Sequence, residues 1–160
     1  MNLFLLRHGE AEPSASTPAG RQLTESGKQE VSSVARQFAS HRFTIDACYV
    51  SPALRAQQTA ETFLSQLFDY PAPSTIEELS ANQRAAQLMK FLEQVDAENI
   101  LLVSHNPILS ELLALLTKGN VEDMVILGTG ELACITLDII GLGMGTCNTI
   151  LHPDSTVSIS

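Results

Sequence analysis

Short apolar runs alternate with longer amphipathic segments along the 160-residue chain. The clearest runs span residues 3–6, 45–50 and 99–103, and each is bounded by polar residues or turn formers. Continuous runs of this length are typical of strands that are buried on both faces of a parallel sheet. Between the runs, apolar residues recur at helical spacing, as at residues 31–38. This alternation of strand and helix predicts an α/β fold with parallel strands.

Capping residues, prolines and the spacing of apolar residues predict four helices. They cover residues 24–40, 52–68, 82–95 and 107–117. Thr24 is a suitable N-cap for the first helix, and Glu25 follows in its first turn. Ser51 and Pro52 predict a cap and a first helical position for the second helix. This arrangement places Arg55 in the first turn, where the free backbone N–H groups already favour an anion.

The remaining segments predict short strands and turns. One strand is expected near residues 75–77, and two more at residues 131–140 and 146–152. The glycine-rich stretch at residues 141–145 resembles half of a dinucleotide-binding loop, but no helix follows it. A hairpin turn between the last two strands is the better interpretation.

Composition and charge limit the class of protein. The chain is 44% hydrophobic and has the length of one domain, so residues 1–160 are expected to form a single domain. No apolar run approaches the roughly 18 residues of a membrane span, and no signal peptide is recognisable, so a cytoplasmic protein is expected. The net charge of −9 argues against a nucleic-acid partner. Because Lys118 is the only basic residue after Lys90, the positions of the few arginines are informative.

Each of the three clearest apolar runs leads to polar residues that can carry chemistry. Arg7, His8 and Gly9 follow the first run. Arg55 lies one helical turn after the second run, and His105 follows the third. Because the carboxyl ends of parallel strands meet at one edge of a sheet, we expect these residues to share a pocket.

Two arginines and two histidines in one pocket favour an anion over a metal ion. The planar guanidinium group binds phosphate through two parallel hydrogen bonds. A neutral imidazole nitrogen is a competent nucleophile toward phosphorus at neutral pH. The pocket is therefore expected to transfer phosphoryl groups without a metal ion or another cofactor.

Four segments of the chain resemble the signature motifs of the histidine phosphatase superfamily, which includes the phosphoglycerate mutases. They are Arg7-His8-Gly9, residues 21–27 (RQLTESG), residues 51–59 (SPALRAQQT) and residues 104–107 (SHNP). The order, spacing and strand context of the motifs agree with the family up to about residue 138. The resemblance implies a phosphoglycerate mutase-like fold, a three-layer sandwich whose mostly parallel central sheet carries helices on both faces.

The resemblance also implies a role for each candidate residue. His8 is implied to be the nucleophile that accepts the phosphoryl group, which water then removes. Gly9 is implied to accept a hydrogen bond from the other ring nitrogen of His8. The residues implied to bind the phosphoryl group or the substrate are Arg7, Gly9, Arg21, Arg55 and His105. An alternative for Arg21 is a solvated charge on the loop in which it lies.

The short separation of Arg55 and His105 narrows the choice within the family. Only 49 residues separate them, and the predicted helices and strands use most of these. No insertion remains that could form the large lid of the mutases and sugar phosphatases of this family. An open pocket suits a phosphoryl group on a protein surface. The chain resembles the small phosphohistidine phosphatases of the family, which implies a histidine-phosphorylated carrier as partner, either an HPt domain of a phosphorelay or a phosphotransfer-system protein.

A general acid is the least defined part of the predicted site. Ester cleavage usually needs an acid to protonate the leaving oxygen, and Glu77 and Glu78 lie in roughly the right interval. The alternative for both is an exposed loop position. The leaving nitrogen of phosphohistidine can be protonated by solvent, so a missing acid favours that substrate. The alternative functions are a small-molecule phosphate monoesterase and a noncatalytic phosphoprotein-binding module.

Overall fold

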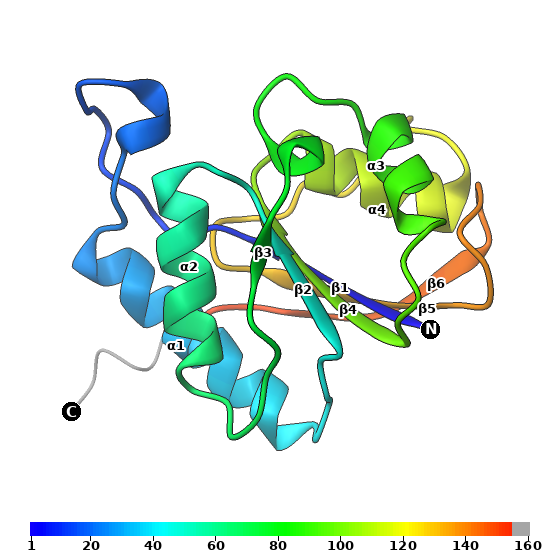
Figure 1. Cartoon of the computed structure of the whole chain (residues 1–160), viewed down its shortest axis with the longest axis horizontal. Coiled ribbons are helices and arrows are strands. Elements are labelled where there is room, and N and C mark those ends of the chain that lie inside the picture. Colours follow the sequence, from blue (N-terminus) through cyan, green and yellow to red (C-terminus); the bar gives the residue numbers. More distant parts are fainter. Residues whose placement is uncertain (155–160) are drawn as a thin grey trace.

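The computed structural model describes residues 1–154, which contain a six-stranded sheet between two layers of helices (Figure 1). In their order across the sheet, the strands are β3 (Ser74–Thr75), β2 (Ala47–Val50), β4 (Asn99–Ser104), β1 (Asn2–Arg7), β5 (Leu132–Leu137) and β6 (Gly145–Leu151). The pairs β3–β2, β2–β4 and β4–β1 are parallel, whereas β1–β5 and β5–β6 are antiparallel. The prediction of an α/β fold with a mostly parallel sheet is confirmed.

Helices cover both faces of the sheet. On one face α1 (Glu25–Ser40) packs against α2 (Leu54–Leu64), and on the other α3 (Ala85–Leu92) packs against α4 (Ile108–Lys118) (Figure 1). This is the three-layer arrangement that the family resemblance implied. None of the helices formed by the described residues has the length and apolar character that a membrane crossing requires.

The apolar run of β1 is buried because both faces of the sheet are covered. Leu3 and Leu5 belong to the core on the side of α3 and α4. Phe4 and Leu6, which alternate with them, belong to the core on the side of α1 and α2. Each of these four side chains is at most 1% exposed. Side chains that point to alternate faces therefore both meet a helical layer, and the strand needs no polar face.

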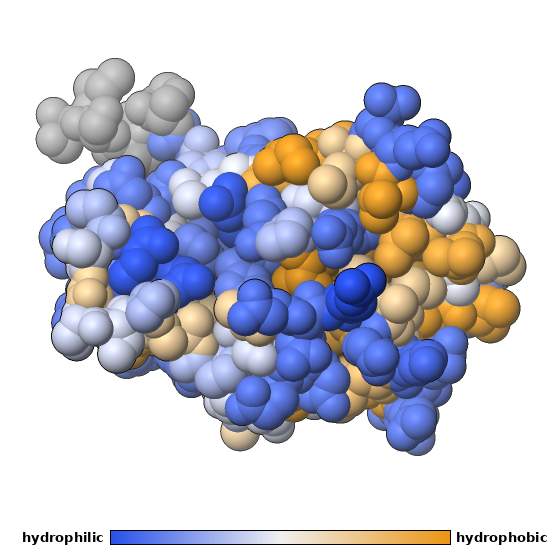
Figure 2. Space-filling view, turned by 90° about the horizontal axis from the view of Figure 1, so that it is seen from above, coloured by the Kyte–Doolittle hydropathy of each residue, from blue (hydrophilic) through white to orange (hydrophobic). Residues whose placement is uncertain are grey.

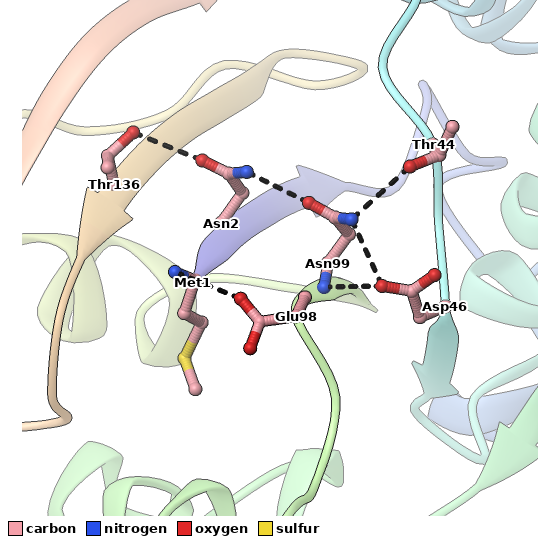
Figure 3. Close-up of polar contacts among 7 residues, drawn as sticks. All are labelled: Met1, Asn2, Thr44, Asp46, Glu98, Asn99 and Thr136. Atoms are coloured by element: carbon pink, nitrogen blue, oxygen red, sulfur yellow. Dashed lines mark hydrogen bonds and ion pairs between the residues drawn. The ribbon is translucent and has the colours of Figure 1, made fainter.

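Polar side chains link neighbouring strands at the amino end of the sheet, as Figure 3 shows. Asn2 donates from Nδ2 to Oδ1 of Asn99 at 2.8 Å and accepts from the Thr136 hydroxyl at 3.1 Å. Asn99 donates from Nδ2 and from its backbone N–H to one carboxylate oxygen of Asp46, each at 3.0 Å. These bonds join β5, β1, β4 and the residue before β2. They help to fix the register of these strands at the edge of the sheet opposite to the carboxyl ends of the parallel strands.

The second helix begins and ends inside its predicted limits of 52 and 68. Ala53 is extended, with a φ of −62° and a ψ of 136°, so α2 begins at Leu54. The Ser51 hydroxyl accepts a hydrogen bond from the Ala53 N–H at 3.2 Å and does not cap the first helical turn. The prediction of Ser51 as the N-cap is therefore wrong, and Ala53 takes that position. Arg55 nevertheless lies in the first turn, as predicted.

The third helix is also shorter than the predicted range 82–95. Asn82 has a left-handed φ of 71° and Arg84 is extended, so α3 begins only after them. The strand predicted near residues 75–77 ends earlier, and a 3-10 helix, η2 (Glu77–Leu79), follows it. Both glutamates that were considered as general acids lie in this short helical turn.

The two late strands form the predicted hairpin and extend the main sheet. β5 pairs with β1 from Leu6 opposite Leu132 to Asn2 opposite Thr136. In the turn between β5 and β6, Gly143 adopts a left-handed φ of 69°, which glycine allows without strain. β1 is therefore an interior strand, with a parallel neighbour on one side and an antiparallel neighbour on the other.

Exposed apolar side chains gather at one end of the molecule. Figure 2 shows this apolar surface at the end where the last turn of α4 and the β5–β6 hairpin lie. Large apolar residues that are exposed in this part of the chain are Val121, Val125, Ile126, Ile139, Leu142 and Met144. The segment from Val121 to Ile126 leads directly to Leu127, which is fully buried. The exposed apolar pair Val125 and Ile126 thus adjoins a residue of the interior.

Close backbone packing joins the start of α1 to the segment after β1. The Thr24 hydroxyl caps α1, as predicted, by accepting a hydrogen bond from the Gly27 N–H at 2.9 Å. A Cβ atom on Gly27 would lie 2.1 Å from the Glu10 carbonyl oxygen. A Cβ atom on Gly9 would lie 2.6 Å from the Gly27 carbonyl oxygen. Neither position has room for a side chain, which explains the glycines in these two sequence motifs.

We expect Gly27→Ala to lower the free energy of unfolding by about 2 kcal/mol, because the added methyl group overlaps the Glu10 backbone. Alanine inside a helix normally stabilises the helix by up to about 1 kcal/mol relative to glycine. A loss of stability would therefore have to come from the steric overlap with Glu10. Chemical denaturation measures the effect. Ser26→Ala, at an exposed position in the same turn, is the control and should change the stability by less than about 0.5 kcal/mol. Unchanged stability of Gly27→Ala would contradict the tight packing.

Candidate active site

The carboxyl ends of β1, β2 and β4 meet at one edge of the sheet. Arg7 of β1 pairs with Ser104 of β4, and Val50 of β2 pairs with Val103 of β4. The His8 N–H extends this pairing by donating to the Ser104 carbonyl oxygen at 2.9 Å. The parallel strands therefore bring the residues after the three apolar runs together, as the sequence predicted.

His8 is held by a hydrogen bond from one of its ring nitrogens. Nδ1 lies 2.7 Å from the Gly9 carbonyl oxygen. A carbonyl oxygen only accepts hydrogen bonds, so Nδ1 carries the proton of the neutral ring and Nε2 keeps its lone pair. Nε2 accepts from Nε of Arg55 at 3.3 Å. The imidazole thus presents an unprotonated nitrogen beside a guanidinium group.

Burial keeps the ring of His8 neutral. His8 is 7% exposed, and burial is the main reason why its pKa is lowered from 6.5 to about 4. The hydrogen bond to Gly9 opposes this shift of the pKa. The positive charges of Arg55, Arg7 and His105 add to it. At neutral pH Nε2 therefore carries a lone pair instead of a proton, as nucleophilic attack requires.

We expect His8 to titrate near pH 4 in the folded protein. In the unfolded chain His8 binds a proton near pH 6.5, whereas in the folded protein it does so only near pH 4. The free energy of unfolding therefore decreases as the pH falls from about 6.5 to about 4. NMR of the labelled imidazole in phosphate-free buffer measures the titration. The spectrum of His8→Ala identifies the signal. A midpoint near 6.5 would contradict the neutral, buried ring.

Arg7 is anchored on one side of its guanidinium group. Nη1 donates to the Leu127 carbonyl oxygen at 2.8 Å. Nε is buried and has no hydrogen-bond partner within residues 1–154. Burial lowers the pKa of Arg7, while the carboxylates of Glu131 and Glu30 oppose this shift. One buried donor of a cationic side chain is thus left for a ligand.

Arg55 connects α2 to the loop after β1. Besides its contact with His8, it donates from Nη1 to the Pro18 carbonyl oxygen of the 3-10 helix η1 (Pro18–Gly20) at 3.1 Å. Burial lowers the pKa of Arg55, and the nearby charge of Arg21 lowers it further. Arg21 itself donates from Nε to the Glu12 carbonyl oxygen at 2.6 Å. Arg21 is therefore tied to its own loop and adds positive potential near Arg55.

His105 has a buried ring nitrogen without a partner. It is 7% exposed, and within the described part of the chain its Nε2 accepts and donates no hydrogen bond. Its Nδ1 lies 3.3 Å from the Ser104 hydroxyl, which donates to the Leu79 carbonyl oxygen at 2.7 Å. The hydroxyl proton is used there, so Nδ1 is the donor in the contact with Ser104. Burial lowers the pKa of His105, and the charges of Arg55 and Arg7 act in the same direction.

Several groups that support the site were not identified from the sequence. Thr59 accepts from the Gly9 N–H at 3.1 Å and donates to the Arg55 carbonyl oxygen at 2.7 Å. Glu30 accepts from the Glu10 N–H at 2.7 Å, so it holds the segment after β1. Thr59 closes one of the four sequence motifs, which was a usable signal. The contact of Glu30 had no such signal, because it depends on how α1 packs.

Glu77 and Glu78 are not joined to the candidate catalytic side chains. Within residues 1–154, no hydrogen bond or ion pair links either carboxylate to the histidines or arginines of the site. The backbone of η2 does reach the site, since the Leu79 carbonyl oxygen accepts from Ser104. The turn therefore supports the end of β4 through its backbone.

The described residues contain no group of three or more His, Cys, Asp and Glu side chains arranged to hold a metal ion. The site itself is rich in cations instead. The guanidinium groups of Arg7 and Arg55 and the imidazole of His105 surround His8, and the described contacts leave a buried nitrogen of Arg7 and one of His105 without a partner. Such an arrangement can bind an oxyanion and stabilise the charge that develops on it.

Comparison with known proteins agrees with this geometry. Residues 3–80 match the histidine phosphatase superfamily (branch 1). The chain is 30% identical over 156 residues to phosphohistidine phosphatase SixA of Escherichia coli K12, covering 96% of this chain and 94% of that protein. It is 32% identical over 125 residues to a SixA homolog of Haemophilus influenzae, covering 71% and 76% of the two chains.

A solved structure of the protein histidine phosphatase SixA in complex with tungstate has the same fold. It superimposes with a TM-score of 0.87 at 29% identity and covers 96% of this chain and 97% of that one. The sequence match to the Escherichia coli protein and the match to this structure each extend over nearly the whole length of both chains. The chain therefore belongs to the histidine phosphatase superfamily, branch 1, and is a phosphatase of that family.

Proposed function

We propose that this protein removes the phosphoryl group from phosphohistidine on a carrier protein, through a covalent intermediate on His8. The observation that carries the proposal is the neutral imidazole of His8, whose Nε2 faces Nε of Arg55 at 3.3 Å. The proposed carrier is an HPt domain of a phosphorelay or a phosphotransfer-system protein. We further propose that residues 1–160 form one histidine phosphatase domain and that this domain acts in the cytoplasm.

In the first step, Nε2 of His8 attacks the phosphorus atom. A new N–P bond forms, and the N–P bond to the imidazole of the carrier breaks. The leaving nitrogen takes a proton from solvent. In the second step, water attacks the phosphorus of phosphohistidine 8, an O–P bond forms, and the N–P bond to Nε2 breaks. The protons of the water go to the released inorganic phosphate or to solvent, so His8 returns to its neutral form. The bond from Nδ1 to Gly9 keeps Nε2 directed at the phosphorus in both steps.

The surrounding cations are proposed to bind the phosphoryl oxygens. Arg7 offers its buried Nε, and Arg55 offers Nε from the first turn of α2. His105 binds through Nε2 after the negative charge of the phosphoryl group has drawn a proton onto that nitrogen. Arg21 contributes charge beside Arg55 and a substrate contact at the rim. These groups stabilise the charge that is shared among the equatorial oxygens in the transition state.

The openness of the site supports a protein substrate. The residues between Arg55 and His105 form the rest of α2, β3, η2, α3 and β4, and no inserted lid rises from them. A small metabolite usually needs such an enclosure. The relatives named above are phosphohistidine phosphatases, which supports the same substrate class for this chain.

The position of the glutamates also favours phosphohistidine over an ester. Among the described residues, neither the Glu77 nor the Glu78 carboxylate forms a hydrogen bond or an ion pair with the catalytic side chains, so these contacts give no support to a general acid for an ester. An imidazole leaving group needs no such acid, because its nitrogen is readily protonated from water. The substrate with the less demanding leaving group is therefore the better match for this site.

Phosphate release from a purified HPt domain, phosphorylated on histidine with phosphoramidate, tests the proposal. A panel of sugar phosphates and phosphoserine runs beside it, with and without excess chelator. We expect fast release from the protein substrate alone, undiminished by the chelator. Preferential release from the esters would overturn the proposal in favour of a monoesterase. Release from no substrate would leave a phosphoprotein-binding module as the function.

A further inference from the structure

The peptide group between Gly9 and Glu10 connects His8 to a carboxylate. Its carbonyl oxygen lies 2.7 Å from Nδ1 of His8 and accepts the ring proton. The N–H of the same peptide group belongs to Glu10 and donates to Oε1 of Glu30 at 2.7 Å. Two short hydrogen bonds in series therefore lead from the ring of the proposed nucleophile, through one peptide group, to the carboxylate of Glu30.

The carboxylate of Glu30 is held at both of its oxygen atoms. Its Oε2 accepts from the Thr129 hydroxyl at 3.1 Å. The N–H of the next residue, Gly130, is shared between the carbonyl oxygens of Arg7 and His8, at 3.1 and 3.0 Å. A Cβ atom on Gly130 would lie 3.1 Å from Cβ of Glu30, so this turn packs closely against the glutamate. The turn before β5 therefore holds Glu30 and the backbone of His8 in one frame.

The ring of His8 becomes positive when it accepts a phosphoryl group. Its Nδ1 already carries a proton, so a new bond at Nε2 uses the lone pair and leaves one positive charge on the imidazole. The positive charges of Arg55, Arg7 and His105 oppose a charge on this ring. A negative charge on the Nδ1 side of the ring would therefore stabilise the product of the attack.

We propose that Glu30 is a positioning residue that supplies this negative charge, acting on His8 through the peptide group between them. This inference rests on the proposed function, in which His8 carries the phosphoryl group. A peptide group whose N–H binds a carboxylate is polarised, so its carbonyl oxygen becomes a stronger acceptor for the Nδ1 proton. Glu30 therefore stabilises the positive ring, in the transition state of the first step and in the phosphoenzyme, more than the neutral ring.

Glu30→Gln tests the inference, because the amide keeps the shape of the side chain and its Oε1 can still accept from the Glu10 N–H. We expect phosphoenzyme formation from the phosphorylated HPt domain to slow about tenfold, the difference between a charged and a neutral acceptor. Breakdown of the phosphoenzyme should keep its rate or become faster, because the ring loses its positive charge in that step. Single-turnover measurements with an alkaline detergent quench separate the two rates. A merely structural loss would slow both.

Two control variants separate the charge from its surroundings. Glu25→Gln removes a negative charge from the exposed start of the same helix and should leave both rates unchanged. Thr129→Val removes the second anchor of Glu30 but keeps the carboxylate on the Glu10 N–H, so formation should slow far less than in Glu30→Gln. An equal loss in Thr129→Val and Glu30→Gln would overturn the inference, because anchoring of the turn would then explain both.

NMR of the resting protein in phosphate-free buffer tests the two hydrogen bonds without a substrate. The Nδ1 proton of His8 and the Glu10 amide proton should both resonate far downfield in the wild type, and the His8 signal should move upfield in Glu30→Gln. Ordinary shifts of both protons in the wild type would overturn the inference whether or not the variant folds.

Three further outcomes would also overturn the inference, namely an unmoved His8 signal, an unchanged rate of phosphoenzyme formation, and equal slowing of both chemical steps. The inhibition constant of inorganic phosphate should not rise in Glu30→Gln, because the variant removes a negative charge near Arg7. Failure of the wild type to hydrolyse the phosphorylated HPt domain would instead contradict the proposed function. The NMR result would then still decide whether Glu30 acts on the ring of His8.

Discussion

His8→Ala is expected to lower kcat by at least about a thousandfold, because the variant lacks the nitrogen that accepts the phosphoryl group. No other side chain of the site can replace it, since His105 presents its free nitrogen to the phosphoryl oxygens and the arginines stay protonated. The measurement is phosphate release from the phosphorylated HPt domain under single-turnover conditions. An alkaline detergent quench, which preserves phosphohistidine, should trap a labelled phosphoenzyme in the wild type and none in the variant.

The control for this variant is His41→Ala. His41 is exposed and stacks on Phe43 with ring centroids 5.1 Å apart, at the end of α1. The His41→Ala variant should keep full activity and form the phosphoenzyme normally. His8 is buried rather than solvent-facing, so the free energy of unfolding is measured for both variants to separate chemistry from stability. Normal turnover by a folded His8→Ala protein would exclude His8 as the nucleophile.

The convergence of the site was predictable because it follows from the strands alone. A run such as residues 3–6 that is apolar on both faces fits only the interior of a covered sheet. Strand and helix alternation then makes the three runs parallel, and their carboxyl ends must meet. The pairing of Arg7 with Ser104 is the result. The identity of the residues at those ends, above all His8, supplied the chemistry.

The anchoring of Arg7 could not be predicted in this way. Its guanidinium donates to the backbone of Leu127, a residue 120 positions away in the sequence. Any residue offers a carbonyl oxygen, so no residue type signals this contact. Asn106 donates to the same carbonyl oxygen at 2.8 Å, and only the path of the chain from α4 to β5 brings this acceptor to both donors. Contacts of this kind depend on the tertiary structure.

The start of α2 shows where a strong local signal fails. Serine followed by proline normally marks the cap and first position of a helix. In this protein the hydroxyl of Ser51 turns back to the Ala53 N–H, and Ser51 is fully buried at the end of β2. The extra extended residues move the first turn of α2 by two positions. Pro52 and Ala53 therefore precede α2 instead of forming its first turn.

Arg55→Ala is expected to lower kcat/KM by about a hundredfold to a thousandfold, because a charged donor is lost where negative charge develops. The loss should fall on both KM and kcat, since Arg55 is proposed to hold the phosphoryl group in the ground state and the transition state. Steady-state kinetics on the phosphorylated HPt domain measures both constants. Arg55→Lys keeps one charge but loses the planar fork, so it should fall between wild type and Arg55→Ala.

The same variant should also change the titration of His8. The charge of Arg55 is one of the causes that lower the pKa of His8, so that pKa should rise in Arg55→Ala. It should stay below 6.5, because burial remains the main cause. Arg36→Ala, at an exposed position of α1, is the control and should leave the kinetics and the titration unchanged. An Arg55→Ala protein with wild-type kcat/KM would exclude Arg55 from the residues that bind the phosphoryl group.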